Sequence, residues 1–266
     1  MPSTATLCET LQSARKACRI SQLELALRLD VSQRHVSFVE SGRAQPSRGL
    51  LLAWLDQLKA PLALRNVALQ QAGFAPAYSR SELHDAVLAP ARSALTQLLQ
   101  ASDPQPAMLM DAAWNVLDLN RGAMWLAQLL VPELLAEVGP GPLNMLDALC
   151  HPAGMASRLK NLDEVGPAVL AHLRDDASVL PELSPRVAQF TDLLKQRLGN
   201  RPLTVPIRQM APVLTSRFDT PHGELAFFSI FSTFGTPQSI TLASLRIEHL
   251  FAADAHTAQV FRAQVG

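Results

Sequence analysis

Residues 21–42 read SQLELALRLDVSQRHVSFVESG, which places two short amphipathic segments on either side of a tight turn. Ser21 can cap a first helix, because serine is a favoured residue at a helix N-terminus. The apolar positions Leu23, Ala26 and Leu27 follow the i, i+3, i+4 spacing of one helix face. The pattern predicts a first helix that packs through these three residues.

The second segment predicts a helix capped by Ser32, with Val36 and Val39 turned inward. The outward residues can make hydrogen bonds to base edges, and they are Gln33, Arg34 and Ser37. Two short helices with such residues in the first turn of the second are typical of a DNA-binding helix-turn-helix. The turn between them holds Asp30, a residue type that tolerates a left-handed backbone.

The charge of the chain is unevenly distributed, although the formal net charge is zero. Residues 1–80 carry ten Lys and Arg against five Asp and Glu, and residues 81–266 carry thirteen against eighteen. The positive charge therefore accompanies the motif, where phosphate contacts need it. A length of 266 residues with 48% hydrophobic content favours two domains.

Helical spacing predicts that the motif belongs to an all-α module of five helices within residues 1–78. The other three are a helix over residues 6–18, a helix capped by Ser47 that runs to about residue 58, and a helix that begins at Pro61 and ends at Gly73. Residues 79–103 then predict a connector helix.

From residue 104 the pattern is that of an α+β domain, which we expect to span residues 104–266. Alternating apolar residues predict strands at 108–110, 114–119, 203–210, 213–219, 224–234 and 239–250. Helical periodicity predicts helices at 121–138, 155–175 and 185–198. This order indicates one antiparallel sheet with helices on one side.

Both halves resemble known families. Residues 11–76, with Ser21-Gln22, Val31-Ser32, Glu40-Ser41-Gly42-Arg43 and Ala72-Gly73-Phe74, resemble the XRE-type helix-turn-helix transcriptional regulators. Residues 104–252, with Trp114-Asn115-Val116 followed by Asn120 and a helix, resemble the MmyB-like ligand-binding domain. The second resemblance implies a PAS-like fold and an association with fatty-acyl ligands.

The candidate DNA-binding residues follow from the motif and from the first resemblance. Gln22 matches a family position that contacts phosphate, at a helix N-terminus that favours anions. Phe38 can touch a thymine methyl group, and His35 either contacts the DNA backbone or packs between helices. The full set is Gln22, Gln33, Arg34, His35, Ser37, Phe38, Arg43 and Arg48. The two flanking arginines are expected to contact phosphates.

The candidate ligand-binding residues lie where a predicted strand meets a helix, together with one residue from a later strand. They are Trp114, Asn120, Arg121, Met124, Trp125 and Phe228. An apolar pocket with few polar anchors suits a lipid-like ligand, and Asn120 or Arg121 could hold a carboxylate. Each apolar member also fits an ordinary core position, and Asn120 also fits a helix cap.

Several classes of function are disfavoured. The sequence contains no G-x-S-x-G, P-loop, C-x-x-C or H-E-x-x-H motif, and its three cysteines lack metal-ligand spacing. We therefore expect no catalytic residues, no metal site and no cofactor. We also expect that the thiols are reduced and that the protein is cytoplasmic, with no membrane segment.

The expected regulator binds double-stranded DNA as a homodimer, since one recognition helix reads only a few base pairs. Its C-terminal domain would sense a small apolar ligand, in the family's terms a fatty-acyl one. Two alternatives stay open: a ligand-free dimerisation or partner-binding module, and an enzyme with titratable groups of perturbed pKa in a cleft.

Overall fold

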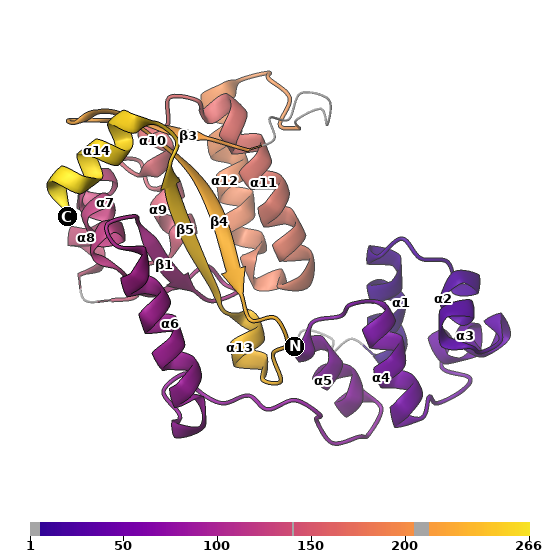
Figure 1. Cartoon of the computed structure of the whole chain (residues 1–266). Coiled ribbons are helices and arrows are strands. Elements are labelled where there is room, and N and C mark those ends of the chain that lie inside the picture. The colour runs from indigo at the N-terminus through magenta and orange to yellow at the C-terminus, as the bar shows by residue number, and fades with distance from the viewer. Residues whose placement is uncertain (1–5, 140, 205–212) are drawn as a thin grey trace. The chain divides into compact units, whose positions relative to one another are not determined.

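The computed structural model describes residues 6–139, 141–204 and 213–266. The chain divides into two compact units (Figure 1). Unit 1 comprises Met1–Glu82 together with Thr236–Ala243, and unit 2 comprises Leu83–Gly235 together with Ser244–Gly266.

Unit 1 contains the five expected helices. They are α1 (Leu7–Ala17), α2 (Gln22–Leu29), α3 (Gln33–Glu40), α4 (Arg48–Gln57) and α5 (Leu62–Gln71). Side chains of Thr6, Ser21, Ser32 and Ser47 each accept a hydrogen bond from the first turn of their helix, as expected for three of them. The fully buried Trp54 of α4 lies in the core that these helices share.

The predicted packing face of α2 is right for Ala26 and wrong for Leu23 and Leu27. Leu23 and Leu27 are 53% and 75% exposed, whereas Leu25 and Ala26 are buried. Both Leu23 with Leu27 and Leu25 with Leu29 have i, i+4 spacing, and the second pair lies toward the core because α2 packs on α3 and α4. The expected left-handed turn is confirmed.

That turn is formed by Asp30, which has φ 53° and ψ 45° at the end of α2. Its backbone N–H bonds to carbonyls of the last turn of the helix, so the unpaired C-terminal carbonyls gain a partner. The short side chain of aspartate makes this conformation less costly than it is for a bulky residue.

Unit 2 is built on a five-stranded antiparallel sheet in the order β2-β1-β5-β4-β3, which confirms the α+β expectation. The strands are β1 (Ala107–Met110), β2 (Val116–Leu119), β3 (Ser216–Thr220), β4 (Gly223–Thr233) and β5 (Arg246–Ala252). The long strands β4 and β5 run side by side through the middle of the unit (Figure 1).

Helices pack around this sheet. They are α6 (Ala89–Ser102), α7 (Arg121–Leu130), α8 (Pro132–Val138), α9 (Met145–Cys150), α10 (Met155–Arg158), α11 (Leu162–Val179), α12 (Ser184–Leu198) and α14 (Ala255–Gln264). Two 3₁₀ turns, Ala86–Leu88 and Pro181–Leu183, precede α6 and α12. Helix α6 packs on β1 and β5, and α14 packs on β4 and β5.

The structure corrects several predicted elements. The helix expected over residues 121–138 is divided at Pro132, whose ring cannot continue the hydrogen-bond ladder of α7. The strand expected over 239–250 begins with a short helix, α13 (Ile240–Ser244), before β5. Helices α9 and α14 were not predicted. The strand predicted at 203–210 falls largely on residues 205–210, outside the described range.

Trp114 was expected in a strand but lies in the turn that precedes β2. Its φ of 66° is left-handed, which is uncommon for a bulky residue. The carboxylate of Asp111 accepts hydrogen bonds from the backbone N–H groups of Ala113 and Asn115 and thereby closes the turn. Side chain to backbone bonds of this kind compete with strand pairing.

Residues 236–243, which connect β4 to β5, belong to unit 1. The sequence analysis predicted that they belong to the C-terminal domain. Ser239 pairs with Ser79, and the Thr241 hydroxyl donates to the Ser81 carbonyl oxygen. Residues 236–243 therefore join the tail of the helical unit, while both strands that they connect belong to unit 2. Conversely, α6 lies in unit 2 and is not a free connector.

Candidate functional site

The predicted recognition surface of unit 1 is the outward face of α3. The Ser32 side chain accepts a hydrogen bond from the His35 N–H at 3.1 Å, which fixes the start of the helix. Gln33 and Arg34 are exposed in the first turn, and Ser37 is half-buried. The expected base-reading residues therefore share one accessible surface. His35 is half-buried, so both interpretations of its role stay open.

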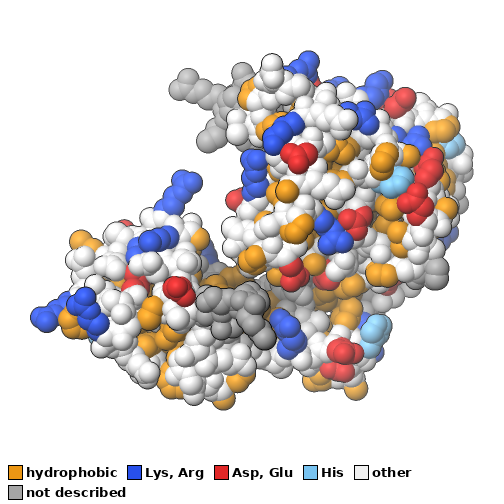
Figure 2. Space-filling view, turned by 180° about the vertical axis from the view of Figure 1, so that it is seen from behind, with side chains coloured by type: hydrophobic (Ala, Val, Ile, Leu, Met, Phe, Trp, Pro, Cys, Tyr) orange, Lys and Arg blue, Asp and Glu red, His pale blue; other side chains and the backbone are white. Residues whose placement is uncertain are grey.

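Phe38 organises two arginines of this surface. The Arg34 guanidinium lies 5.0 Å from the centroid of the Phe38 ring, and the Arg43 guanidinium lies 5.5 Å from it. Cation–π attraction can hold both cations near the ring. Arg48 is exposed at the first position of α4. Lys and Arg side chains project from the visible face of unit 1 (Figure 2), as phosphate binding requires.

A buried ion pair beneath this surface was missed by the sequence analysis. Arg15 of α1 donates to both carboxylate oxygens of Glu40 at 2.6 and 2.8 Å, and it also donates to the Ile20 carbonyl. Gln22 donates to the same carboxylate at 2.8 Å. The pair ties α3 to α1 and holds Gln22 at the N-terminus of α2. The sequence did offer a signal for this pair, because Arg15 and Glu40 are opposite charges at helix positions that face the core.

The environment of Glu40 favours its charged form. Burial acts to raise its pKa, but the hydrogen bonds from Arg15 and Gln22 outweigh burial and lower the pKa below its usual value. The same pairing raises the pKa of Arg15. Both groups are therefore ionised at neutral pH, and neither is free to bind an external ligand.

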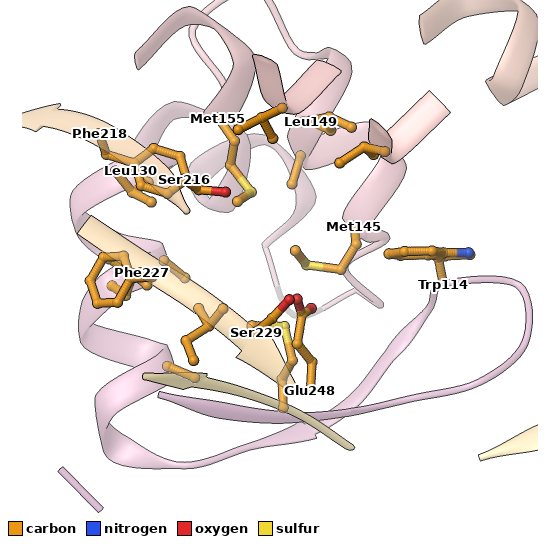
Figure 3. A pocket seen from close by; sticks show the side chains of 18 of the residues that line it. Trp114, Leu130, Met145, Leu149, Met155, Ser216, Phe218, Phe227, Ser229 and Glu248 are labelled. Carbon is orange, nitrogen blue, oxygen red and sulfur yellow. The ribbon is translucent and has the colours of Figure 1, made fainter. Parts of the chain in front are cut away.

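Unit 2 contains a cavity of about 520 Å³ between the sheet and helices α7, α9 and α11 (Figure 3). Leucine, valine, alanine, methionine and phenylalanine side chains form most of its wall, among them Leu130, Met145, Leu149, Met155, Phe218 and Phe227. This volume lies within the range of pockets that hold small molecules. The wall is suited to an apolar ligand.

Few polar groups face the cavity. Among the described lining residues these are the His172, Ser216, Ser229 and Glu248 side chains, and no Lys, Arg, Asn or Gln lines it. Figure 3 shows the oxygens of Ser229 and Glu248 close together at the sheet side of the cavity. Burial raises the pKa of Glu248, and the Ser229 hydroxyl and the charge of Arg246 oppose that shift only partly.

Trp114 lines the cavity and is surrounded by charged and aromatic side chains. Its indole N–H donates to Asp176 at 2.8 Å, and the Arg246 guanidinium lies 4.0 Å from the centroid of its ring. Arg246 also bonds to Asp176 at 3.2 Å and lies 5.5 Å from the Phe231 ring. These contacts fix the orientation of the Trp114 side chain at the cavity wall.

The predicted ligand-binding residues are not all brought together. Trp114 lines the cavity. Phe228 has atoms at the cavity, but its ring stacks on Phe251 at 5.5 Å, on the face of the sheet opposite Ser229 and Phe231. The remaining four predicted residues, Asn120, Arg121, Met124 and Trp125, line a separate shallow depression over α7.

The side chain of Asn120 has a structural role, because it joins several backbone segments by hydrogen bonds. Its Oδ1 accepts hydrogen bonds from the N–H groups of Ala107 and Ala123, both at 2.9 Å, and its Nδ2 donates to the carbonyls of Leu99 and Gln105. The amide therefore uses both donors and both lone pairs. It has no capacity left to hold a ligand carboxylate, which corrects that expectation.

Arg121 does not face the cavity either. Its side chain is 69% exposed and is paired with Asp103 at 3.2 Å. The nearby ring of Trp125 packs edge-on against Phe261 at 4.8 Å, and Met124 is exposed. These three residues form part of the outer surface and the packing of α7, away from the large cavity.

Among the described residues that line the cavity, Glu248 is the one group with a shifted pKa, and no nucleophilic cysteine lies beside it. Burial, with a contribution from Asp147, raises the pKa of Cys150 to about 11, so this thiol is a poor nucleophile. No group of three potential metal ligands occurs in the part of the chain that was described. Within the same residues, no helix has the length and apolarity needed to cross a membrane.

Two family models match the chain. The helix-turn-helix model covers residues 11–64, and the model of the MmyB-like transcription regulator ligand binding domain covers residues 91–263. A search of curated proteins found no match. The first model spans the recognition surface of unit 1, and the second spans the residues that line the cavity.

Proposed function

The chain belongs to the MmyB-like transcription regulators, and on that premise we propose that it binds a specific operator and senses a small apolar ligand in unit 2. The proposal that unit 2 binds a ligand rests on the cavity of about 520 Å³ with its largely apolar wall. A module that served only to dimerise would have a filled core in its place. A fatty-acyl chain is one class of molecule whose apolar part suits this wall.

The DNA half of the proposal rests on the outward face of α3. Gln33, Arg34 and Ser37 are the proposed base-reading residues, and Phe38 is the proposed contact for a thymine methyl group. Gln22, Arg43, Arg48 and His35 are proposed to position the phosphate backbone. A homodimer would place two recognition helices about 34 Å apart on a palindromic operator.

The segment that connects β4 to β5 is a means by which a ligand in unit 2 could affect DNA binding by unit 1. Strands β4 and β5 line the cavity, yet the residues that join them, 236–243, belong to unit 1. A ligand that favours one arrangement of these strands would bias the segment attached to the helical unit. Regulation requires that the ligand bind two arrangements with different affinity.

Fluorescence anisotropy with fragments of the protein's own upstream DNA tests the first half. We expect Arg34→Ala to weaken specific binding by about 5- to 150-fold, because one base contact is worth about 1–3 kcal/mol. Arg201→Ala is the control, since this exposed arginine of unit 2 is paired with Asp163 outside the motif. Equal affinities of the Arg34 variant and the wild type would contradict base reading by α3.

Native mass spectrometry of the purified full chain tests the second half. We expect adducts of apolar small molecules, and we expect added decanol to raise the unfolding temperature of unit 2. A protein that carries no adduct and does not respond to medium-chain compounds would support the alternative, a ligand-free dimerisation or partner-binding module.

A further inference from the structure

Glu248 is the one carboxylate among the described residues that line the cavity. It lies in the middle of β5, opposite Phe231 of β4 and Met108 of β1 in the sheet register. Residues paired in this way share a face of the sheet, and all three line the cavity. Ser229, two residues before Phe231, lies on the same face, and its oxygen is next to the Glu248 carboxyl in Figure 3.

The Glu248 carboxyl has hydrogen-bonding capacity that the described residues do not fill. A carboxylate offers about four lone-pair sites. The Ser229 hydroxyl supplies one hydrogen bond, and burial in an apolar wall makes the unpaired sites costly. A ligand group that donates a hydrogen bond would occupy a lone-pair site that none of the described residues fills.

The charges around Glu248 do not favour a ligand carboxylate. The other titratable residue lining the described wall is His172 of α11. Arg246, two positions earlier on β5, is engaged by Asp176 and by the Trp114 ring. Its Nε and Nη2 atoms have no hydrogen-bond partner among the residues that the structure describes, but they have almost no accessible surface and so do not face the open volume.

Resting on the proposed function of unit 2, we propose that the cavity selects apolar molecules whose head group donates a hydrogen bond, an alcohol or an amine. The head group would lie on Glu248 and Ser229, with the apolar tail along the wall formed by α7 and α9. An ionised carboxylate head group donates no hydrogen bond and so leaves the acceptor sites of Glu248 unfilled, and whenever Glu248 is ionised it would also place two like charges in contact.

Isothermal titration of the full chain at pH 7.5 tests this inference, with decanol below its solubility limit and with decylamine and decanoate below their micelle concentrations. We expect decanol or decylamine to bind about tenfold or more tightly than decanoate. Glu248→Gln should reduce that ratio to about threefold or less, mainly by improving decanoate binding. Ser229→Ala should weaken decanol binding and serves as a second, less intrusive variant.

Glu224→Gln is the matched control, because this carboxyl of β4 pairs with Lys160 and does not line the cavity. It should leave the ratio unchanged. Decanoate binding as tightly as decanol, or an unchanged ratio in Glu248→Gln, overturns the inference while the sensing function stands. Decanoate binding that Arg246→Gln abolishes would instead place a carboxylate at Arg246. Failure of all three compounds to bind overturns the sensing function as well.

Discussion

The buried pair between Arg15 and Glu40 should control the stability of the helix-turn-helix. Glu40→Ala removes a side chain that is 1% exposed and leaves Arg15, 10% exposed, without its carboxylate partner. Breaking a buried ion pair in this way costs about 3–5 kcal/mol. It also frees Gln22, which bonds to the same carboxylate. We therefore expect a lower free energy of local opening for α1 and α3 and weaker DNA binding.

Hydrogen exchange measured by mass spectrometry reports this local opening without requiring the two units to unfold together. Peptides from α1 and α3 should exchange about 100-fold faster or more in Glu40→Ala than in the wild type. The control is Glu24→Ala, which breaks the exposed pair with Arg28. Exposed pairs contribute about 0–1 kcal/mol, so this variant should differ little from the wild type.

The pH dependence of the same pair has a definite sign. The pKa of Glu40 is lowered in the folded state, so its stabilising contribution is present above the unfolded value of 4.5 and is lost as the pH falls through the folded value. Protection of α3 should therefore decrease on acidification in the wild type and not in Glu40→Gln. Equal exchange in the Glu40 and Glu24 alanine variants would show that the buried pair does not hold α3.

Three further predictions concern unit 2. The pKa of Glu248 is raised in the fold, so stability should fall as the pH rises above 4.5 and through the folded value, and thermal unfolding of Glu248→Gln should lack that dependence. Ala168→Phe should fill the cavity and weaken decanol binding about tenfold or more in titration calorimetry, whereas Ala171→Phe on the exposed face of α11 should not. Asn120→Ala should destabilise unit 2 by about 2–4 kcal/mol in urea unfolding, because buried partners lose their bonds, without changing decanol affinity. An Asn120→Ala variant that stays as stable as the wild type but no longer binds decanol would show that Asn120 does bind the ligand.

Local signals in the sequence were sufficient to predict the helices and caps of unit 1, though not all of its packing. Ser21 and Ser32 cap helices through bonds within one turn, and Asp30 adopts the left-handed turn by its own chemistry. The sequence alone does not show which face of α2 packs on the core. Two pairs of leucines have the same i, i+4 spacing, Leu23 with Leu27 and Leu25 with Leu29. Only contact with α3 and α4 distinguishes the two pairs.

The candidate ligand site depends more on long-range contacts. Trp114 was identified, but its turn is set by Asp111 and its orientation by residues more than 60 positions away. The face occupied by Phe228 follows from strand register, which a run of aromatic residues does not define. Glu248 was missed because a charge within a strand is typical of a solvent-facing position, and the cavity in front of it forms only after the helices pack.

The central claim is that occupancy of the cavity changes DNA binding. The most direct measurement is the operator affinity of the full chain by anisotropy, with and without saturating decanol, in the wild type and in Ala168→Phe. We predict a change of about fivefold or more in the wild type and none in the filled-cavity variant. The same operator affinity in all four samples, with decanol binding to the wild type demonstrated by calorimetry, would contradict the coupling of the two units.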